Sequence, residues 1–209
     1  MVKIIKQDYL ENKKIYNCIE EDLRKDMDKN IPITHVGSTA IPDMYGKNII
    51  DILIGASDKN QFEEITHVLV NKGFVPSKKS KDEIYQFFSS TEAETGSGDT
   101  HIHLVISNTE RYSEFIILKD YLLNNKEEAL NYSKFKKGIV HNGIKDRKQY
   151  KTLKSEYVTK LLKRAKMWNN SLKRWLIFWL KFTTIDSAIK VFKNFFKFGK
   201  ITQMYWKCI

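Results

Sequence analysis

The feature that most constrains the fold is a pair of apolar segments, each interrupted by one polar element. Residues 33–36 have the composition of a short strand, and this run ends at Gly37-Ser38. Residues 47–54 form a second, strongly apolar strand that contains a single acid, Asp51. An ionised carboxylate is costly to bury unless it is paired, hydrogen-bonded or bound to a metal. We therefore expect Asp51 to lie where this strand meets a polar cleft.

Gly37 and Ser38 supply what a phosphate requires: a backbone with no Cβ in the way, exposed N–H groups and a hydroxyl. Their spacing taken alone favours a simple turn over a binding site. Asp51 also has a structural interpretation, as an acid that accepts backbone hydrogen bonds. Its position in the middle of an apolar strand favours a functional role.

Two histidines are spaced by two residues in a third predicted strand, residues 101–106. Side chains at this spacing project from the same face of a strand, so His101 and His103 point the same way, with Asp99 in phase. Neutral imidazoles in this arrangement commonly bind a divalent metal. Two histidines that hydrogen-bond in a polar cleft explain the pattern equally well.

The remaining periodicity predicts an α+β domain, because strands dominate the first half and helices the second. Predicted helices cover residues 8–28, 61–72, 111–124, 127–137 and 145–166, and further short strands cover residues 74–75 and 84–88.

Four separated blocks, in this order, resemble the GrpB-like family of the nucleotidyltransferase superfamily. They are His-Val-Gly-Ser-Thr-Ala-Ile-Pro at 35–42, Lys-Asn-Ile-Ile-Asp-Ile at 47–52, Thr-His-Ile-His-Leu-Val at 100–105 and Lys-Asp-Tyr-Leu at 119–122. The resemblance covers residues 5–166 and implies a nucleotidyltransferase-like mixed sheet packed with helices. It also implies a bound nucleoside triphosphate, or a related phosphorylated ligand, together with Mg²⁺ or Mn²⁺.

The resemblance assigns roles to specific residues. Phosphate contacts fall to Gly37, Ser38, Thr39, Lys47 and Lys119. Metal contacts fall to Asp51, which is also the candidate catalytic residue, and to Asp99, His101 and His103. An active member would promote in-line attack of an acceptor hydroxyl on the α-phosphorus and release pyrophosphate.

Two departures from the superfamily pattern matter for mechanism. Active members carry a second acid two residues after the first, and this chain has Leu53 there. Lys119 stands where the family usually has arginine, which keeps the charge but loses bidentate geometry. Either Asp99, His101 and His103 supply the missing metal ligands, or the chain is a non-catalytic nucleotide-binding or phosphate-binding module.

Cysteine content and hydropathy point to a cytoplasmic protein. The two cysteines, Cys18 and Cys208, form neither a disulfide framework nor a zinc-binding pattern. The N-terminal residues turn polar too early for a signal peptide, and no apolar stretch approaches the length of a membrane span.

The charge distribution predicts a boundary between residues 1–166 and residues 167–209. The second segment carries a net charge of +7, against +4 for the rest of the chain. Residues 183–199 have the pattern of a basic, aromatic amphipathic helix. Such a C-terminal extension fits an anionic membrane surface best, through residues 171–200. Packing on the domain or on a second subunit is next, and nucleic acid third.

Overall fold

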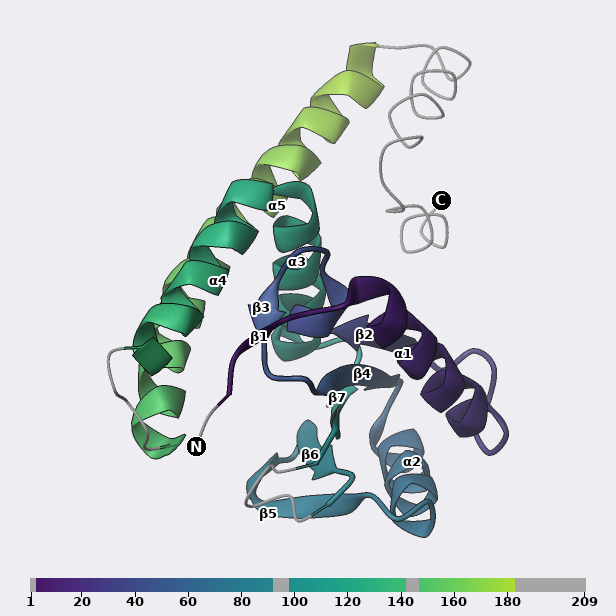
Figure 1. Ribbon diagram of the computed structural model, residues 1–209. Coiled ribbons are helices and arrows are strands. Elements are labelled where there is room, and N and C mark those ends of the chain that lie inside the picture. Colours follow the sequence, from purple (N-terminus) through teal and green to yellow (C-terminus); the bar gives the residue numbers. More distant parts are fainter. Residues whose placement is uncertain (1–2, 92–97, 142–146, 183–209) are drawn as a thin grey trace.

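The computed structural model describes residues 3–91, 98–141 and 147–182. Its large sheet contains β2 (Ile33–Val36), β4 (Ile50–Ala56), β5 (Val75–Asp82), β6 (Tyr85–Ser89) and β7 (Thr100–Ile106), while β1 (Ile5–Lys6) and β3 (Tyr45–Gly46) form a separate pair. The helices are α1 (Tyr9–Arg24), α2 (Lys59–Asn71), α3 (Glu110–Asn124), α4 (Lys126–His141) and α5 (Arg147–Phe182), with a short 3₁₀ turn, η1 (Ser38–Ala40). Figure 1 shows their arrangement.

The large sheet is mixed, with the strand order β2-β4-β7-β6-β5. Only the central β4–β7 pair is parallel, and the chain crosses between these two strands through α2 and the β5–β6 hairpin. This topology confirms the predicted α+β class with a mixed sheet.

Three helices begin at residues whose side chains cap them. The side-chain oxygens of Asp8, Asp58 and Thr109 accept hydrogen bonds from backbone N–H groups three residues later, at 3.0, 2.9 and 3.3 Å. Each cap satisfies an N–H group that has no partner inside its helix, which stabilises a helix by about 1 kcal/mol. These short-range signals fix where α1, α2 and α3 start against the sheet.

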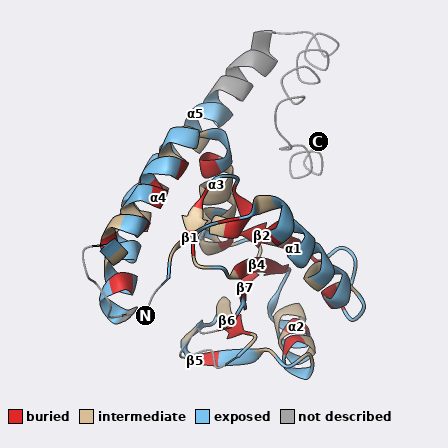
Figure 2. Ribbon diagram, in the orientation of Figure 1, coloured by how far each residue is buried: buried red, intermediate tan, exposed pale blue. Residues whose placement is uncertain are grey.

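One face of the large sheet is covered by α1 and α2. Ile52, Ile54 and Leu104, from the two central strands, are completely buried there against Leu23 of α1 and Leu69 of α2. Burying a side chain of this size stabilises the fold by about 1.5–3 kcal/mol. Figure 2 shows how such buried residues concentrate on the central strands.

The opposite face of the sheet is packed against α3, and Asp51 lies on this face. Leu53 points to this face and packs with Val36 and Val105 against Tyr112 of α3. Because strand side chains alternate, Asp51 lies on the same face as Leu53, two residues earlier. Unlike Leu53, which is fully buried, the Asp51 side chain is 27% exposed.

Helices α4 and α5 form a further layer on α3. Tyr121, Tyr132 and Leu161, one from each of the three helices, share a buried cluster with Ile41 and Met44. The predicted boundary after residue 166 lies inside α5, which continues to Phe182, and Figure 1 shows its last turns projecting past α3 and α4.

The predicted amphipathic helix at residues 183–199 lies outside the described residues. Among the helices that the structure does describe, none combines the length and the apolar character needed to cross a membrane.

Candidate functional site

Asp51 lies beside both predicted histidines because β4 and β7 run parallel. The register pairs Asp51 with His101 and Leu53 with His103. Nδ1 of His101 is 3.3 Å from Oδ1 of Asp51, and Nε2 of His103 is 3.9 Å from the same oxygen. The imidazoles are largely shielded from solvent, with 15% and 18% of their side-chain surfaces exposed.

This environment keeps Asp51 ionised. Burial acts to raise the pKa of the carboxyl group, but hydrogen bonds and charge interactions with His101 and His103 outweigh it and hold the pKa well below its usual range. The site therefore contains a carboxylate, an acceptor-only group that suits a divalent cation or a hydrogen-bond donor.

A polar network continues from this carboxylate toward β6. The hydroxyl of Tyr85 is 3.0 Å from Nδ1 of His103, so Tyr85, His103, Asp51 and His101 form one connected set. In the neutral ring with Nδ1–H toward Asp51, Nε2 of His101 is an acceptor, whereas in the protonated ring it is a donor. In the described part of the chain, Nε2 of His101 is the one buried side-chain nitrogen or oxygen atom without a hydrogen-bond partner.

The backbone at Gly37 touches Asp51 from the neighbouring strand. Gly37 has φ = +75° and ψ = −168°, a conformation that is essentially restricted to glycine. A Cβ added here would lie 2.9 Å from Cβ and Cγ of Asp51 and closer still to Oδ2. The predicted Gly-Ser turn and the predicted acid are therefore in direct contact.

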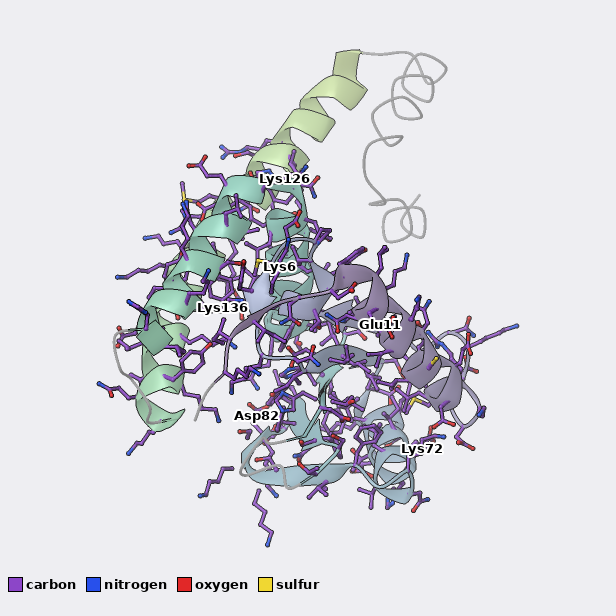
Figure 3. The ribbon with its side chains drawn as sticks, in the orientation of Figure 1. Lys6, Glu11, Lys72, Asp82, Lys126 and Lys136 are labelled. Atoms are coloured by element: carbon purple, nitrogen blue, oxygen red, sulfur yellow. The ribbon has the colours of Figure 1, made fainter. Side chains whose placement is uncertain are left out.

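Ser38 meets a residue that the sequence analysis did not select, Lys136 of α4. Nζ of Lys136 donates a hydrogen bond of 2.6 Å to Oγ of Ser38 and lies 4.4 Å from the centre of the Tyr132 ring. Lys136 is 98 residues away from Ser38 in sequence, and only 2% of its surface is exposed. Figure 3 labels Lys136 on α4.

A sequence signal for Lys136 exists in the periodicity of α4. The buried positions of this helix recur at helical spacing, and a lysine occupies one of them: Ala129, Tyr132, Ser133, Lys136 and Ile139. A lysine inside an apolar helical stripe is informative in the same way as Asp51 inside an apolar strand, because burying either charge is costly unless it is paired or hydrogen-bonded.

The other residues predicted to contact phosphate, Thr39, Lys47 and Lys119, have different surroundings. Thr39 is completely buried, where its hydroxyl donates to the carbonyl of Ile49 at 3.1 Å and lies 2.9 Å from Nε2 of His35. Lys47 lies 5.5 Å from the centre of the Tyr150 ring. Lys119, on α3, is half-buried, and this burial lowers its pKa.

Asp99 stands apart from the other predicted metal ligands. Its carboxylate accepts hydrogen bonds from the hydroxyls of Ser90 at 2.7 Å and Thr100 at 3.2 Å. In the described ranges no ion pair joins Asp99 to His101 or His103. Within these same ranges, no three His, Cys, Asp or Glu side chains are arranged to hold a metal ion. A cation at Asp51 would thus require oxygen ligands from a bound molecule or water, as Mg²⁺ at phosphate sites usually does.

The fold and the site define an α+β protein of the GrpB type. The family model described as "GrpB protein" matches residues 5–164, so the chain belongs to the GrpB family, as its sequence motifs predicted.

Curated relatives support this assignment. UPF0157 protein PA4798 of Pseudomonas aeruginosa is 29% identical over 133 residues, which cover 64% of this chain and 54% of that protein. The chain thus spans about half the length of that relative. The glutamate-rich protein GrpB of Alkalihalophilus pseudofirmus is 29% identical over 135 residues, covering 62% of this chain and 76% of that protein.

Solved structures resemble the fold. The crystal structure of GrpB from Enterococcus faecalis matches with a TM-score of 0.68 at 18% identity, over 79% of this chain and 99% of that one. A looser match, with a TM-score of 0.44 at 12% identity, is to Cid1, described as having RNA terminal uridylyl transferase activity, over 64% of this chain and 41% of that one.

Proposed function

We propose that this protein binds a nucleoside triphosphate, or a related phosphorylated ligand, together with Mg²⁺ or Mn²⁺, and transfers a nucleotidyl group to an acceptor hydroxyl. The observation that carries the proposal is the contact between the Gly37-Ser38 turn and Asp51, together with the hydrogen bond from Lys136 to Ser38. A backbone turn of a kind that suits phosphate is thus close both to an anion that would attract metal and to a lysine that would attract phosphate.

The charges explain why a metal belongs to this proposal. Asp51 is ionised, so it would repel a phosphate that approaches the Gly37-Ser38 turn. A divalent cation shared by the carboxylate and the phosphate oxygens removes that repulsion and polarises the phosphoryl group. Asp51 would be the protein ligand of this cation, and Gly37 and Ser38 would hold the phosphate.

A second candidate function, a binding module without catalysis, is favoured by one specific observation. Leu53 occupies the position of the superfamily's second acid, and it is fully buried against α3. The missing carboxylate is thus replaced by part of the hydrophobic core. A module of this kind would bind the same ligand but release no pyrophosphate.

The experiment that separates the two candidates is a product assay on the purified protein. Each nucleoside triphosphate is incubated with Mg²⁺ or Mn²⁺, alone and with cell extract, and both pyrophosphate and labelled product are measured. Product with any metal supports transfer. Nucleotide binding without product under every condition supports the module, and absence of nucleotide binding contradicts both.

Asp51→Asn is expected to remove the metal dependence of nucleotide binding while the fold stays intact, because the change deletes a charge but almost no volume. Calorimetric titrations with and without Mg²⁺ measure this dependence, and circular dichroism checks the fold. Asp99→Asn is the matched comparison and is expected to keep the metal dependence, since its carboxylate is bound by Ser90 and Thr100. An unchanged metal dependence in Asp51→Asn would reduce Asp51 to a structural acid.

For the C-terminal extension we propose peripheral binding to an anionic membrane surface through residues 171–200. Its basic and aromatic composition supports this, since each lysine near such a surface contributes about 1 kcal/mol. The full chain is expected to co-sediment with vesicles of phosphatidylserine and phosphatidylcholine, and added salt to release it. Failure to sediment with these vesicles at low salt would contradict the proposal.

A further inference from the structure

Lys136 is a buried lysine with no carboxylate paired to it in the part of the chain that the structure describes. Its side chain is 2% exposed, and among the described residues no carboxylate forms an ion pair with it. Its contacts are the hydroxyl of Ser38 and the face of the Tyr132 ring. An ammonium group is expensive to bury in this way, so a lysine is retained at such a position only for a reason.

The surroundings of Lys136 leave its protonation close to balance at neutral pH. Burial lowers the pKa of Lys136 to about 7, and Lys154 of α5 acts in the same direction, while Asp51 of β4 opposes both. The Tyr132 ring, on α4 itself, favours the charged form through a cation–π interaction. An anion beside Nζ would stabilise the ammonium ion and shift the protonation equilibrium of Lys136 toward the charged form.

We propose that Lys136 and Ser38 form a binding site for the terminal phosphate of a polyphosphate, and that this site takes up one proton as the phosphate enters. The inference deepens the proposed function, on which it rests for the identity of the ligand. In the binding step, the Nζ lone pair accepts a proton from solvent, and the resulting ammonium ion pairs with a phosphate oxygen. No other bond forms or breaks.

The donor groups of Ser38 and Lys136 are arranged in a way that suits a bound phosphate. The hydroxyl of Ser38 accepts a hydrogen bond from Lys136 and keeps its own hydrogen to donate to an anion. Glycine at position 46 allows this arrangement, because a Cβ there would lie 2.7 Å from Cβ of Ser38 and 3.6 Å from Nζ of Lys136. Ser38 is partly exposed and the neighbouring Gly37 is exposed, so the hydroxyl lies on the solvent side of the buried amine. A charge-assisted contact from Lys136 and an O–H donor from Ser38 are what a terminal phosphate binds.

The test is calorimetric titration with inorganic tripolyphosphate, without metal, at pH 6 and pH 8.5, each in two buffers with different heats of ionisation. We expect almost no proton uptake by the protein at pH 6 and nearly one proton per ligand at pH 8.5. We also expect the affinity to fall about tenfold for each pH unit above 7, because the unliganded site must first be protonated.

Three variants make the result specific to Lys136. Lys136→Arg keeps a cation that does not titrate in this range, so its affinity should lack the tenfold fall per pH unit, and any remaining pH dependence and proton exchange should report the ligand alone. Lys136→Met should lose most tripolyphosphate binding at pH 6. This variant tests the role of Lys136 even if the arginine variant does not fold. Lys134→Met, an exposed lysine of the same helix, should behave as the wild type.

The inference fails if tripolyphosphate does not bind at pH 6, if Lys136→Met binds as well as the wild type, or if Lys136→Arg shows the wild-type pH slope. These outcomes are separate from failure of the proposed function. Proton-coupled binding of tripolyphosphate without nucleotide transfer would leave this site standing and remove only the transfer reaction.

Discussion

Replacing Gly37 with alanine is expected to abolish nucleotide binding and to lower the free energy of unfolding by about 3 kcal/mol. Two costs add at this position. The backbone has φ = +75°, which strains any residue with a Cβ, and the new methyl group would collide with the carboxylate of Asp51. Relief of the collision must move either the turn that holds Ser38 or Asp51 itself. Urea denaturation measures the stability, and calorimetry with nucleotide and Mg²⁺ measures binding.

Gly73→Ala is the matched control for this experiment. Gly73 also has a positive φ, +85°, but a Cβ there would meet nothing within 4 Å. This variant should therefore show only the backbone cost, about 1 kcal/mol, and normal nucleotide binding. Equal behaviour of the two variants would mean that the contact between Gly37 and Asp51 has no particular role in the site.

The central strands were predictable because their burial leaves a clear pattern. The expected strand at residues 33–36 coincides with β2, and the apolar run around Asp51 contains most of β4. Strands that are covered on both faces require nearly continuous apolar residues, and this requirement is visible in a single sequence. The first four helices were placed to within a few residues for the same reason, since each buries one regular stripe. The last predicted helix, residues 145–166, ends too early, because α5 continues to Phe182.

The edge of the sheet was not predictable in the same way. Residues 74–75 were expected to form a short strand, but β5 extends from Val75 to Asp82 with the sequence Val-Pro-Ser-Lys-Lys-Ser-Lys-Asp. An edge strand is paired on one side only, and lysines on it protect against unwanted pairing. Because β5 is polar, it lacks the alternation of apolar residues by which a strand is recognised in a sequence.

The change in charge balance at residue 166 does not coincide with the end of a helix. The charge balance changes there, but α5 continues through it, and the ring of Trp168 lies 5.6 Å from that of Tyr121 in α3. Helix continuity depends on local propensity and on packing against neighbours, neither of which is recorded in net charge.

The site itself was half predictable. Strand alternation predicted that His101 and His103 share a face, and the family resemblance grouped them with Asp51 and Asp99. The parallel pairing of β4 with β7, which brings the two histidines to Asp51, is seen only in the structure. The position of Lys136 inside the buried stripe of α4 was visible in the sequence, but its partner Ser38 is 98 residues away and no local pattern identifies it.

Lys136→Met is expected to increase the stability of the unliganded protein at pH 6, and this advantage should shrink as the pH rises. In the native state the pKa of Lys136 is about 7, below the ordinary value of 10.5 for the unfolded chain. Below pH 7 both states carry the proton, and the native state bears the full cost of a buried ammonium ion. Between pH 7 and about 10 the unfolded state binds more protons, so the stability of the wild type rises by about 1.4 kcal/mol per pH unit.

Methionine has no such dependence, and it fills the space of the lysine stem. Urea denaturation of the wild type and of Lys136→Met at pH 6, 7, 8 and 9 measures the difference directly, since shifts at other residues are common to both proteins and cancel. Lys134→Met, at an exposed position of α4, should show no pH-dependent difference from the wild type. A gap between wild type and Lys136→Met that stayed constant from pH 6 to pH 9 would mean that Lys136 keeps its proton in the folded protein. In that case an ammonium ion is already present at the Ser38 hydroxyl before any phosphate arrives.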